Sequence, residues 1–218
     1  KRVLITAGPT HEKIDPVRFI GNFSSGKTGC ELAKCAASLG ATVDLVIGPS
    51  HEEVHHPLIN RFNIETADEM LNISKKKFKY VDIAIFSAAV SDFKCETIYS
   101  EKIKKKSFTI KTQSNPDIIK SLSHFKKKQF IVGFALETEN ALENAINKMK
   151  SKKMDLIVLN SLNGENSCFS HDSNKIKIID NSLNIKDFSI QSKKEIAHNI
   201  FNEILFQKSF LSSLNKVK

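Results

Sequence analysis

The sequence predicts an α/β fold: a Rossmann-like, mostly parallel sheet flanked by helices, with a C-terminal β-hairpin appendage. Short apolar runs alternate with longer amphipathic stretches through the first 160 residues, which is the pattern of parallel strands connected by helices. The final part changes to two adjacent β-rich runs followed by one amphipathic stretch. The length of 218 residues fits one domain better than two.

Alternating strands and helices account for the first part of the chain. Gly40 ends a stretch with apolar residues at helical spacing, and the strand-like run ATVDLVI follows directly. We expect strand 3–8, helix 26–39, strand 41–47, helix 67–77 and strand 81–86.

The same alternation continues to about residue 160. Asn115 is a favourable N-cap and Pro116 a favourable first helical residue, so we expect a helix to begin there. The elements expected in this part are helix 115–122, strand 130–134, helix 139–152 and strand 155–159.

The remaining segment predicts a β-hairpin and a helix. The β-rich runs 175–180 and 183–190 flank a turn at 181–182. Ser192-Lys-Lys-Glu195 matches the capping box S-x-x-E and predicts a helix that reaches about residue 206. We expect one domain over 1–218, made of a Rossmann-like part at about 1–160, a hairpin at about 170–192 and a C-terminal helix at about 192–210.

Composition favours an ordinary globular protein with a cytoplasmic location; the lysine runs indicate solvated faces or, as the alternative, a preference for anionic small molecules. The net charge is +9, but the lysine runs carry no interleaved aromatic residues and no nucleic-acid motif, so we expect no nucleic-acid partner. No apolar run approaches the length of a membrane span, and no signal segment opens the chain. The four cysteines are too scattered for a C-x-x-C site or a disulfide framework. Because the chain starts at Lys1 without Met, we expect that something precedes it.

The string GNFSSGKT at 21–28 matches the P-loop expression G-x-x-x-x-G-K-[ST]. A P-loop should leave the end of a buried strand directly, but the clear strand ends more than a dozen residues earlier, at Gly8. The nearest Walker B candidate, Asp92, lies six residues past Phe86. The physical signal that remains is a helix start with glycines and unpaired N–H groups, which favours an anion. The Rossmann fingerprint G-x-G-x-x-G is absent after the first strand, which disfavours hydride transfer.

Five segments occur in the order found in one family: ITAGPTHEKIDPVRFIGNFSSGK at 5–27, SAAVSDF at 87–93, EKIKKK at 101–106, NPDII at 115–119 and VGFALET at 132–138. Over about residues 3–160, and more loosely beyond, the chain resembles phosphopantothenate–cysteine ligase of the bacterial type. In this family many members have Ser where Gly21 stands and Met where Thr28 stands, so the P-loop match is coincidental.

The resemblance implies a ligase of coenzyme A biosynthesis. Such a ligase joins 4′-phosphopantothenate and L-cysteine with CTP, through an acyl-cytidylate, and releases CMP and pyrophosphate. CTP rather than ATP is the expected co-substrate, and Mg²⁺ is expected because pyrophosphate leaves; the metal ligands are unknown. The resemblance also implies a homodimer, helped by the hairpin, and a fused or associated flavin-dependent decarboxylase domain; no membrane partner is expected. A P-loop phosphotransferase or NTPase and a non-catalytic nucleotide-sensing module stay open as alternatives.

Site residues follow from the same resemblance. Asn22 matches an asparagine that supports turnover of the acyl-nucleotide, and Lys102 a lysine on a mobile loop that meets the triphosphate; these are the expected catalytic residues. The expected phosphopantothenate-binding residues are Ser24, Gly26 and Gly29. The expected nucleotide-binding residues are Phe86, Ser87, Ala88, Ala89, Asp92, Lys102, Pro116, Asp117, Ile118, Ile119, Phe134, Lys148 and Lys152.

Overall fold

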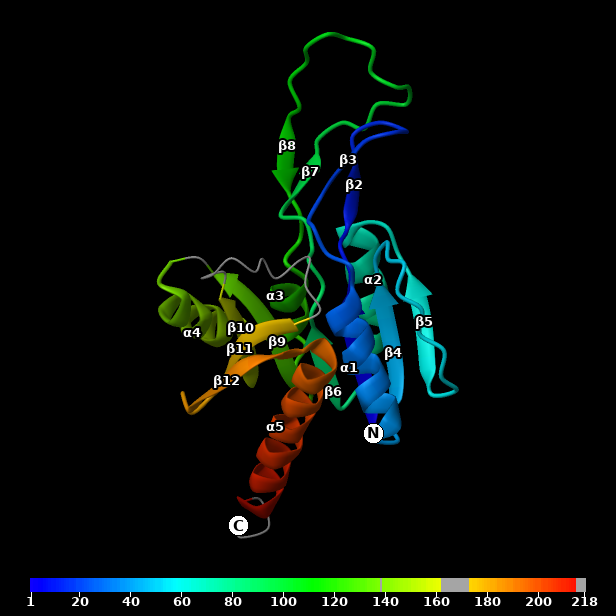
Figure 1. Cartoon of the computed structure of the whole chain (residues 1–218). Helices are drawn as coiled ribbons and strands as arrows, with labels where there is room; N and C mark the ends of the chain where they lie inside the picture. Colours follow the sequence, from blue (N-terminus) through cyan, green and yellow to red (C-terminus); the bar gives the residue numbers. More distant parts are fainter. Residues whose placement is uncertain (138, 162–172, 215–218) are drawn as a thin grey trace.

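An eight-stranded sheet forms the centre of the molecule (Figure 1). The structure is a computed structural model that describes residues 1–137, 139–161 and 173–214. The strand order is β12-β11-β10-β9-β6-β1-β4-β5; β11 pairs antiparallel with both β10 and β12, and the other neighbours pair parallel. This confirms the predicted α/β fold. The strands are β1 (Arg2–Ala7), β4 (Thr42–Ile47), β5 (Ile59–Asn63), β6 (Ile83–Phe86), β9 (Phe130–Glu137), β10 (Leu156–Ser161), β11 (Ser173–Asp180) and β12 (Ile185–Ser192).

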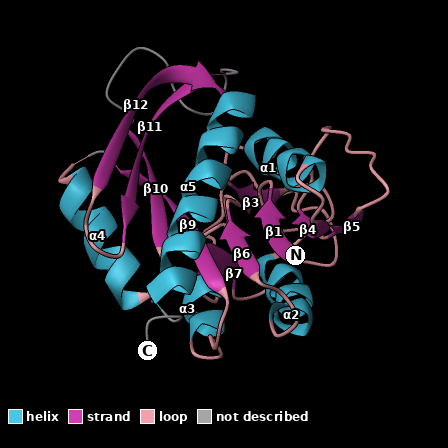
Figure 2. Cartoon of the chain, turned by 90° about the horizontal axis from the view of Figure 1, so that it is seen from below, coloured by secondary structure: helices cyan, strands magenta, loops and turns pink. Residues whose placement is uncertain are grey.

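Helices cover both faces of the sheet (Figure 2). They are α1 (Lys27–Ser38), α2 (Ala67–Phe78), α3 (Ile118–Ser123), α4 (Ala141–Ser151) and α5 (Lys193–Leu214). One apolar core lies under α1 and α5, for example at Leu32 and Ile200. A second core lies under α2, α3 and α4, for example at Met70 and Met149. Because both faces are buried, the central strands are continuous apolar runs, and this is why the sequence pattern reveals them.

Helix α1 packs closely on β1. A Cβ added at Gly29 would lie 2.3 Å from the Cβ of Ala7, so only glycine permits this approach. Gly26, the N-cap of α1, has φ 82°, a left-handed conformation that also favours glycine. Two glycines of GNFSSGKTG therefore set where the helix begins and how near the sheet it lies.

Helix α3 begins later than the sequence predicts. Asn115 is not its N-cap, and Pro116 is not its first residue; the N-cap is Asp117, whose carboxylate accepts a hydrogen bond from the Lys120 amide at 2.9 Å. The Asn115 side chain is oriented toward segment 89–92, where its Nδ2 donates to the Ser91 carbonyl at 2.9 Å, and its Oδ1 accepts no hydrogen bond from a helix amide.

The C-terminal hairpin continues the main sheet, because β11 pairs with β10. Its turn is longer than the predicted 181–182. The Asp180 carboxylate accepts hydrogen bonds from the amides of Ser182 and Asn184, and Leu183 takes φ 65°, so the second strand starts only at Ile185. The predicted capping box is confirmed by two hydrogen bonds between Ser192 and Glu195.

A two-part arm projects beyond the sheet (Figure 1). One part is the hairpin of β2 (His11–Lys13) and β3 (Phe19–Gly21), and the other is the ribbon of β7 (Phe93–Cys95) and β8 (Thr112–Ser114). We call these two parts together the arm, and residues 96–111, between β7 and β8, the Lys102 loop. The sequence pattern did not predict the arm, since its strands have only three residues each.

Among the described residues, no helix is both long enough and apolar enough to cross a membrane. The cysteines in this part of the chain, Cys30, Cys35 and Cys95, are buried and form no disulfide. Cys168 lies outside the described residues.

Candidate active site

One cleft of about 540 Å³ lies at the carboxyl ends of β6, β9 and β10. The carboxyl ends of parallel strands meet at one edge of a sheet, so residues that follow different strands converge there. Every predicted site residue except Lys102 lines this cleft. They are Asn22, Ser24, Gly26, Gly29, Phe86, Ser87, Ala88, Ala89, Asp92, Pro116, Asp117, Ile118, Ile119, Phe134, Lys148 and Lys152.

The start of α1 forms one wall of the cleft. The hydroxyl oxygens of Ser24 and Ser25 accept hydrogen bonds, at 3.3 Å each, from the amides of Gly26 and Lys27. Gly26 itself provides no side-chain cap for the helix. The first-turn N–H groups and the helix dipole therefore present positive potential toward the cleft, which suits a phosphate or carboxylate group.

The segment 89–92, after β6, is held in place by three side chains. The Asn22 amide donates to the Val90 carbonyl at 2.9 Å, and the Asn115 amide donates to the Ser91 carbonyl at the same distance. From behind, the Thr10 hydroxyl accepts from the Ser91 N–H at 3.0 Å. Asp92 is exposed in the cleft at the end of this segment. These contacts place Asn22 and Asp92 on one rim of the cleft.

The opposite wall carries a cationic pair. Lys148 lies on α4 and Lys152 is the residue that caps its C-terminus, so the spacing of four places both at one cleft, as predicted. The Lys152 ammonium pairs with the Asp117 carboxylate at 2.6 Å. Burial, followed by the nearby Lys152 charge, lowers the pKa of Lys148. Burial would raise the pKa of Asp117, but hydrogen bonds from the Lys120 amide and Lys152 hold that pKa below its ordinary value.

The cleft-lining residues that sequence reasoning missed include three polar ones, Asn160, Asn174 and Lys193, from β10, β11 and the start of α5. In the part of the chain that the structure describes, the side-chain oxygens of Asn115 and Asn160 are buried without a hydrogen-bond partner. Asn160 follows the strand-like run DLIVL directly. A polar residue at the carboxyl end of a predicted parallel strand could therefore have indicated a cleft position. Asn174 lies in no motif, and Lys193 lies in the capping box, which predicts a helix start and not a binding site.

Lys102 lies elsewhere. It is exposed on the Lys102 loop, at the arm, and does not line the cleft. The fold therefore brings all the predicted site residues together in the cleft except Lys102, which lies outside it.

The structure supports neither a P-loop nor a dinucleotide-binding Rossmann site. GNFSSGKT follows β3 of the arm, whereas the sheet strand before it, β1, ends at Ala7. Asp44 is buried within β4 and pairs with Arg2 at 2.8 Å, which is a structural role. Among the described residues, no group of three or more His, Cys, Asp or Glu side chains is placed to hold a metal ion.

Comparison with known proteins identifies the family. Residues 1–207 match the family described as DFP, the DNA/pantothenate metabolism flavoprotein C-terminal domain. The chain belongs to this family. The solved C-terminal domain of the coenzyme A biosynthesis bifunctional protein CoaBC has a TM-score of 0.83 with this chain at 35% identity, and the match covers 96% of each chain. The resemblance carried by the five sequence segments is thereby confirmed.

Two curated relatives show how much of a longer protein the chain spans. CoaBC of Bacillus subtilis (strain 168) is 37% identical over 206 residues, which cover 94% of this chain and 51% of that protein. A protein named cysteine/cysteine sulfinic acid decarboxylase, from an unknown prokaryotic organism, is 46% identical over 208 residues, which cover 94% of this chain and 58% of that protein. This DFP domain therefore spans about half the length of the curated relatives it matches.

Proposed function

We propose that this DFP domain joins 4′-phosphopantothenate to L-cysteine, with CTP as the activating nucleotide and ATP as the less favoured one. The observation that carries the proposal is one cleft in which the residues implied by the ligase resemblance converge, with the exception of Lys102. The homology to the C-terminal domain of CoaBC, a bifunctional protein of coenzyme A biosynthesis, supports it.

The proposed chemistry activates a carboxylate in one step and displaces the activating group in the next. A carboxylate oxygen of phosphopantothenate attacks the α-phosphorus of the nucleotide, and pyrophosphate leaves. The cysteine amine then attacks the acyl carbon and loses a proton, and CMP leaves with the oxygen that came from the carboxylate. Both reactants are anionic, so N–H groups and cations at the cleft lower the cost of bringing them together.

Each wall of the cleft has a proposed role. The start of α1, with Ser24, Gly26 and Gly29, binds the phosphate of phosphopantothenate. Lys148 and Lys152 bind the triphosphate, as two cations on one wall suit one polyphosphate. Asn22 contacts the acyl-nucleotide: its amide already donates to the Val90 carbonyl, and an amide offers both a donor and an acceptor without adding charge.

A magnesium ion fits this cleft through its carboxylates. Mg²⁺ commonly binds one or two protein carboxylates together with substrate phosphates. Asp92 is exposed in the cleft, while Asp117 is engaged by Lys152, so Asp92 is the residue that would hold the ion. When bound, Mg²⁺ stabilises the charge that develops on the leaving pyrophosphate.

A homodimer is part of the proposal, and two exposed apolar surfaces support it. On the arm, Val17, Phe19 and Ile98 are more than half exposed, and on the edge strand β12, Ile190 is 62% exposed. Light scattering on a sizing column, at several protein concentrations, tests for the dimer. We further propose that the domain acts in the cytoplasm beside a decarboxylase domain, as the longer CoaBC relatives suggest.

A pyrophosphate-release assay tests the function. We expect release with CTP only when phosphopantothenate is present, and conversion to phosphopantothenoylcysteine only when cysteine is added. Nucleotide hydrolysis without phosphopantothenate would favour the P-loop alternative, and nucleotide binding with no turnover would favour a sensing module. Carbon dioxide release from cysteine or cysteine sulfinic acid, without nucleotide, would favour the activity that the 46% identical relative is named for.

A further inference from the structure

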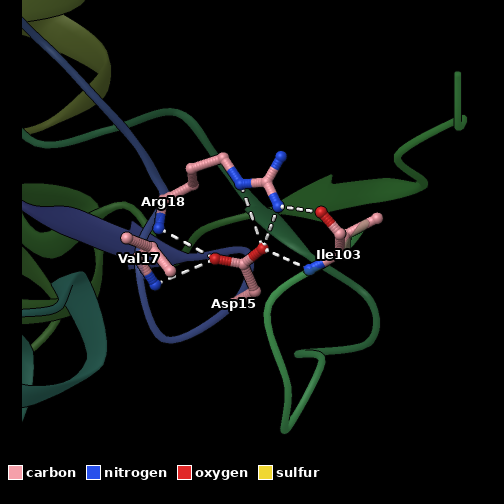
Figure 3. A network of polar contacts seen from close by, with 4 residues as sticks. All are labelled: Asp15, Val17, Arg18 and Ile103. Carbon is pink, nitrogen blue, oxygen red and sulfur yellow. Dashed lines mark hydrogen bonds and ion pairs between the residues drawn. The ribbon is translucent and has the colours of Figure 1, made fainter. Parts of the chain in front are cut away.

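The β2–β3 hairpin contains an ion pair between Asp15 and Arg18, and both residues hydrogen-bond to Ile103 of the Lys102 loop (Figure 3). The Asp15 side chain, at the turn of the β2–β3 hairpin, is fully buried. One of its oxygens accepts hydrogen bonds from the amides of Val17 and Arg18, at 2.9 and 3.0 Å. The other accepts from the Arg18 guanidinium and, at 3.1 Å, from the amide of Ile103, which lies 88 residues away in the chain.

Both backbone polar groups of Ile103 are hydrogen-bonded to the hairpin. Its N–H donates to Asp15, and its carbonyl accepts from the Arg18 Nη2 at 2.8 Å (Figure 3). The guanidinium also lies over the Phe108 ring, 5.5 Å from its centroid. Two residues of the hairpin thus fix the middle of the Lys102 loop, and Ile103 is the residue next to Lys102.

The hairpin that holds the loop is itself fixed to the body of the domain. The His11 amide donates to the Glu65 carbonyl at 2.7 Å, and the buried Glu12 carboxylate accepts from the amide of Ala67, the first residue of α2, at 2.9 Å. The contacts therefore run without a break from the sheet-covering helix α2, through β2 and Asp15, to the Lys102 loop.

Asp15 is the acceptor in every hydrogen bond described above. This is the pattern of an ionised carboxylate and not of a carboxylic acid. Burial alone would raise the pKa of Asp15, but the hydrogen bonds from Ile103, Arg18 and Val17 hold that pKa well below its usual range. Because the Asp15 carboxylate is buried, loss of the Arg18 guanidinium would leave that charge without its charged partner, which is costly.

We propose that Asp15 is a positioning residue: it fixes the Lys102 loop through Ile103, and so determines where the Lys102 ammonium can meet the triphosphate. This inference rests on the proposed ligase function, because it takes from that function the role of Lys102. Asp15 itself lies outside the cleft and touches no substrate there.

Asp15→Asn tests the proposal by kinetics and by amide hydrogen exchange. We expect exchange at Ile103 and across 99–108 to become faster while β1 and β4 keep their protection. We expect kcat/KM for CTP to fall roughly 10- to 100-fold, because small displacements of a positioning group have effects of this size. The KM for phosphopantothenate should stay within about twofold, since that substrate is bound by the cleft.

A double-mutant cycle separates positioning from general damage. If Asp15 acts through Lys102, the double variant Asp15→Asn with Lys102→Ala should be no slower than Lys102→Ala alone. Glu65→Gln is the matched control, because it removes the exposed ion pair with Lys13 from the same hairpin without touching the loop; activity should not change. Ile103→Pro removes the N–H that donates to Asp15, and so breaks the same contact from the loop side. It replaces Asp15→Asn in the test if that variant does not fold.

Three results would overturn the proposal. The first is unchanged exchange across 99–108, measured at Ile103 in Asp15→Asn and at the neighbouring amides in Ile103→Pro, where position 103 has no amide hydrogen. The second is faster exchange with unchanged kinetics, and the third is full additivity with Lys102→Ala. If the wild-type protein releases no pyrophosphate at all, the proposed function fails and this role for Asp15 fails with it. The exchange measurement then still shows, independently, whether Asp15 holds the loop.

Discussion

The cleft and the arm achieve order in different ways. The cleft is formed by residues that follow central strands, so the sheet itself brings Phe86, Phe134 and Asn160 to one edge. The arm has only three-residue strands and depends on particular side chains, chiefly Asp15 and Arg18, to hold its shape. A position in the cleft is thus secured by the whole core, whereas a position on the arm rests on a few polar contacts.

The largest effect is expected where the cleft wall meets the core. Gly29→Val places a side chain where the Cβ alone would lie 2.3 Å from Ala7, so α1 must move off β1. We expect the free energy of unfolding to fall by roughly 3 kcal/mol, at the upper end for overpacking. Gly40→Ala is the control: a Cβ there meets nothing within 4 Å, and only its φ of +77° opposes alanine, at about 1 kcal/mol. Denaturant titrations of both variants make the comparison; equal losses would contradict the close-packing account.

The next effect compares the rate lost on removing a lysine near the arm with the rate lost on removing one in the cleft. Lys102→Ala should slow pyrophosphate release roughly 100-fold, the scale of losing one charge-stabilising group in a transition state. Lys27→Ala, within the P-loop-like string and lining the cleft, should cost less than about tenfold. Steady-state rates at saturating substrates measure both. The reverse order would restore the Walker interpretation of GNFSSGKT.

A smaller effect separates the two chemical steps at the cleft. Asn22→Asp adds a negative charge beside the proposed anionic intermediate and removes the donor to Val90. We expect the cysteine-dependent step to slow about tenfold, with the acyl-nucleotide accumulating. Mass spectrometry of the quenched reaction detects that species. Normal turnover with no intermediate would remove Asn22 from its proposed role.

The smallest effect is a pH dependence. Burial lowers the pKa of Lys148, so this lysine loses its charge at a lower pH than the ordinary value of 10.5. Only the charged form attracts a triphosphate, and nucleotide affinity should therefore fall as the pH rises through that lowered pKa. We expect the KM for CTP to rise roughly threefold between neutral and alkaline pH. In Lys148→Arg the rise should be absent, because arginine stays charged throughout.

Sequence patterns predicted the strands and helices of the body because buried parallel strands are long and apolar on both faces. They missed β2, β3, β7 and β8, whose three residues each are too short to show a period, and β5, whose INRFN mixes polar and apolar side chains. They also placed the start of α3 too early. Asn115 is a residue type that often caps helices, but here its side-chain amide donates to the Ser91 carbonyl.

The site shows the same division. Motif residues predicted from the resemblance converge in one cleft, because each motif follows a strand or opens a helix at the same sheet edge. The contact between Asp15 and Ile103 joins positions 88 residues apart and leaves no periodic signal in the sequence. Lys193 and Asn174 line the cleft only because the C-terminal hairpin continues the main sheet, a pairing that the local pattern does not contain.

The central claim is that the cleft activates the carboxylate of phosphopantothenate by transferring a nucleotidyl group to it. Phosphopantothenate labelled with oxygen-18 in its carboxylate, reacted with CTP, Mg²⁺ and cysteine, tests this directly. The account predicts one labelled oxygen in CMP and none in pyrophosphate, because the acyl C–O bond breaks when the amine attacks. Label in inorganic phosphate with CDP as the product, or no label in any nucleotide product, would contradict it.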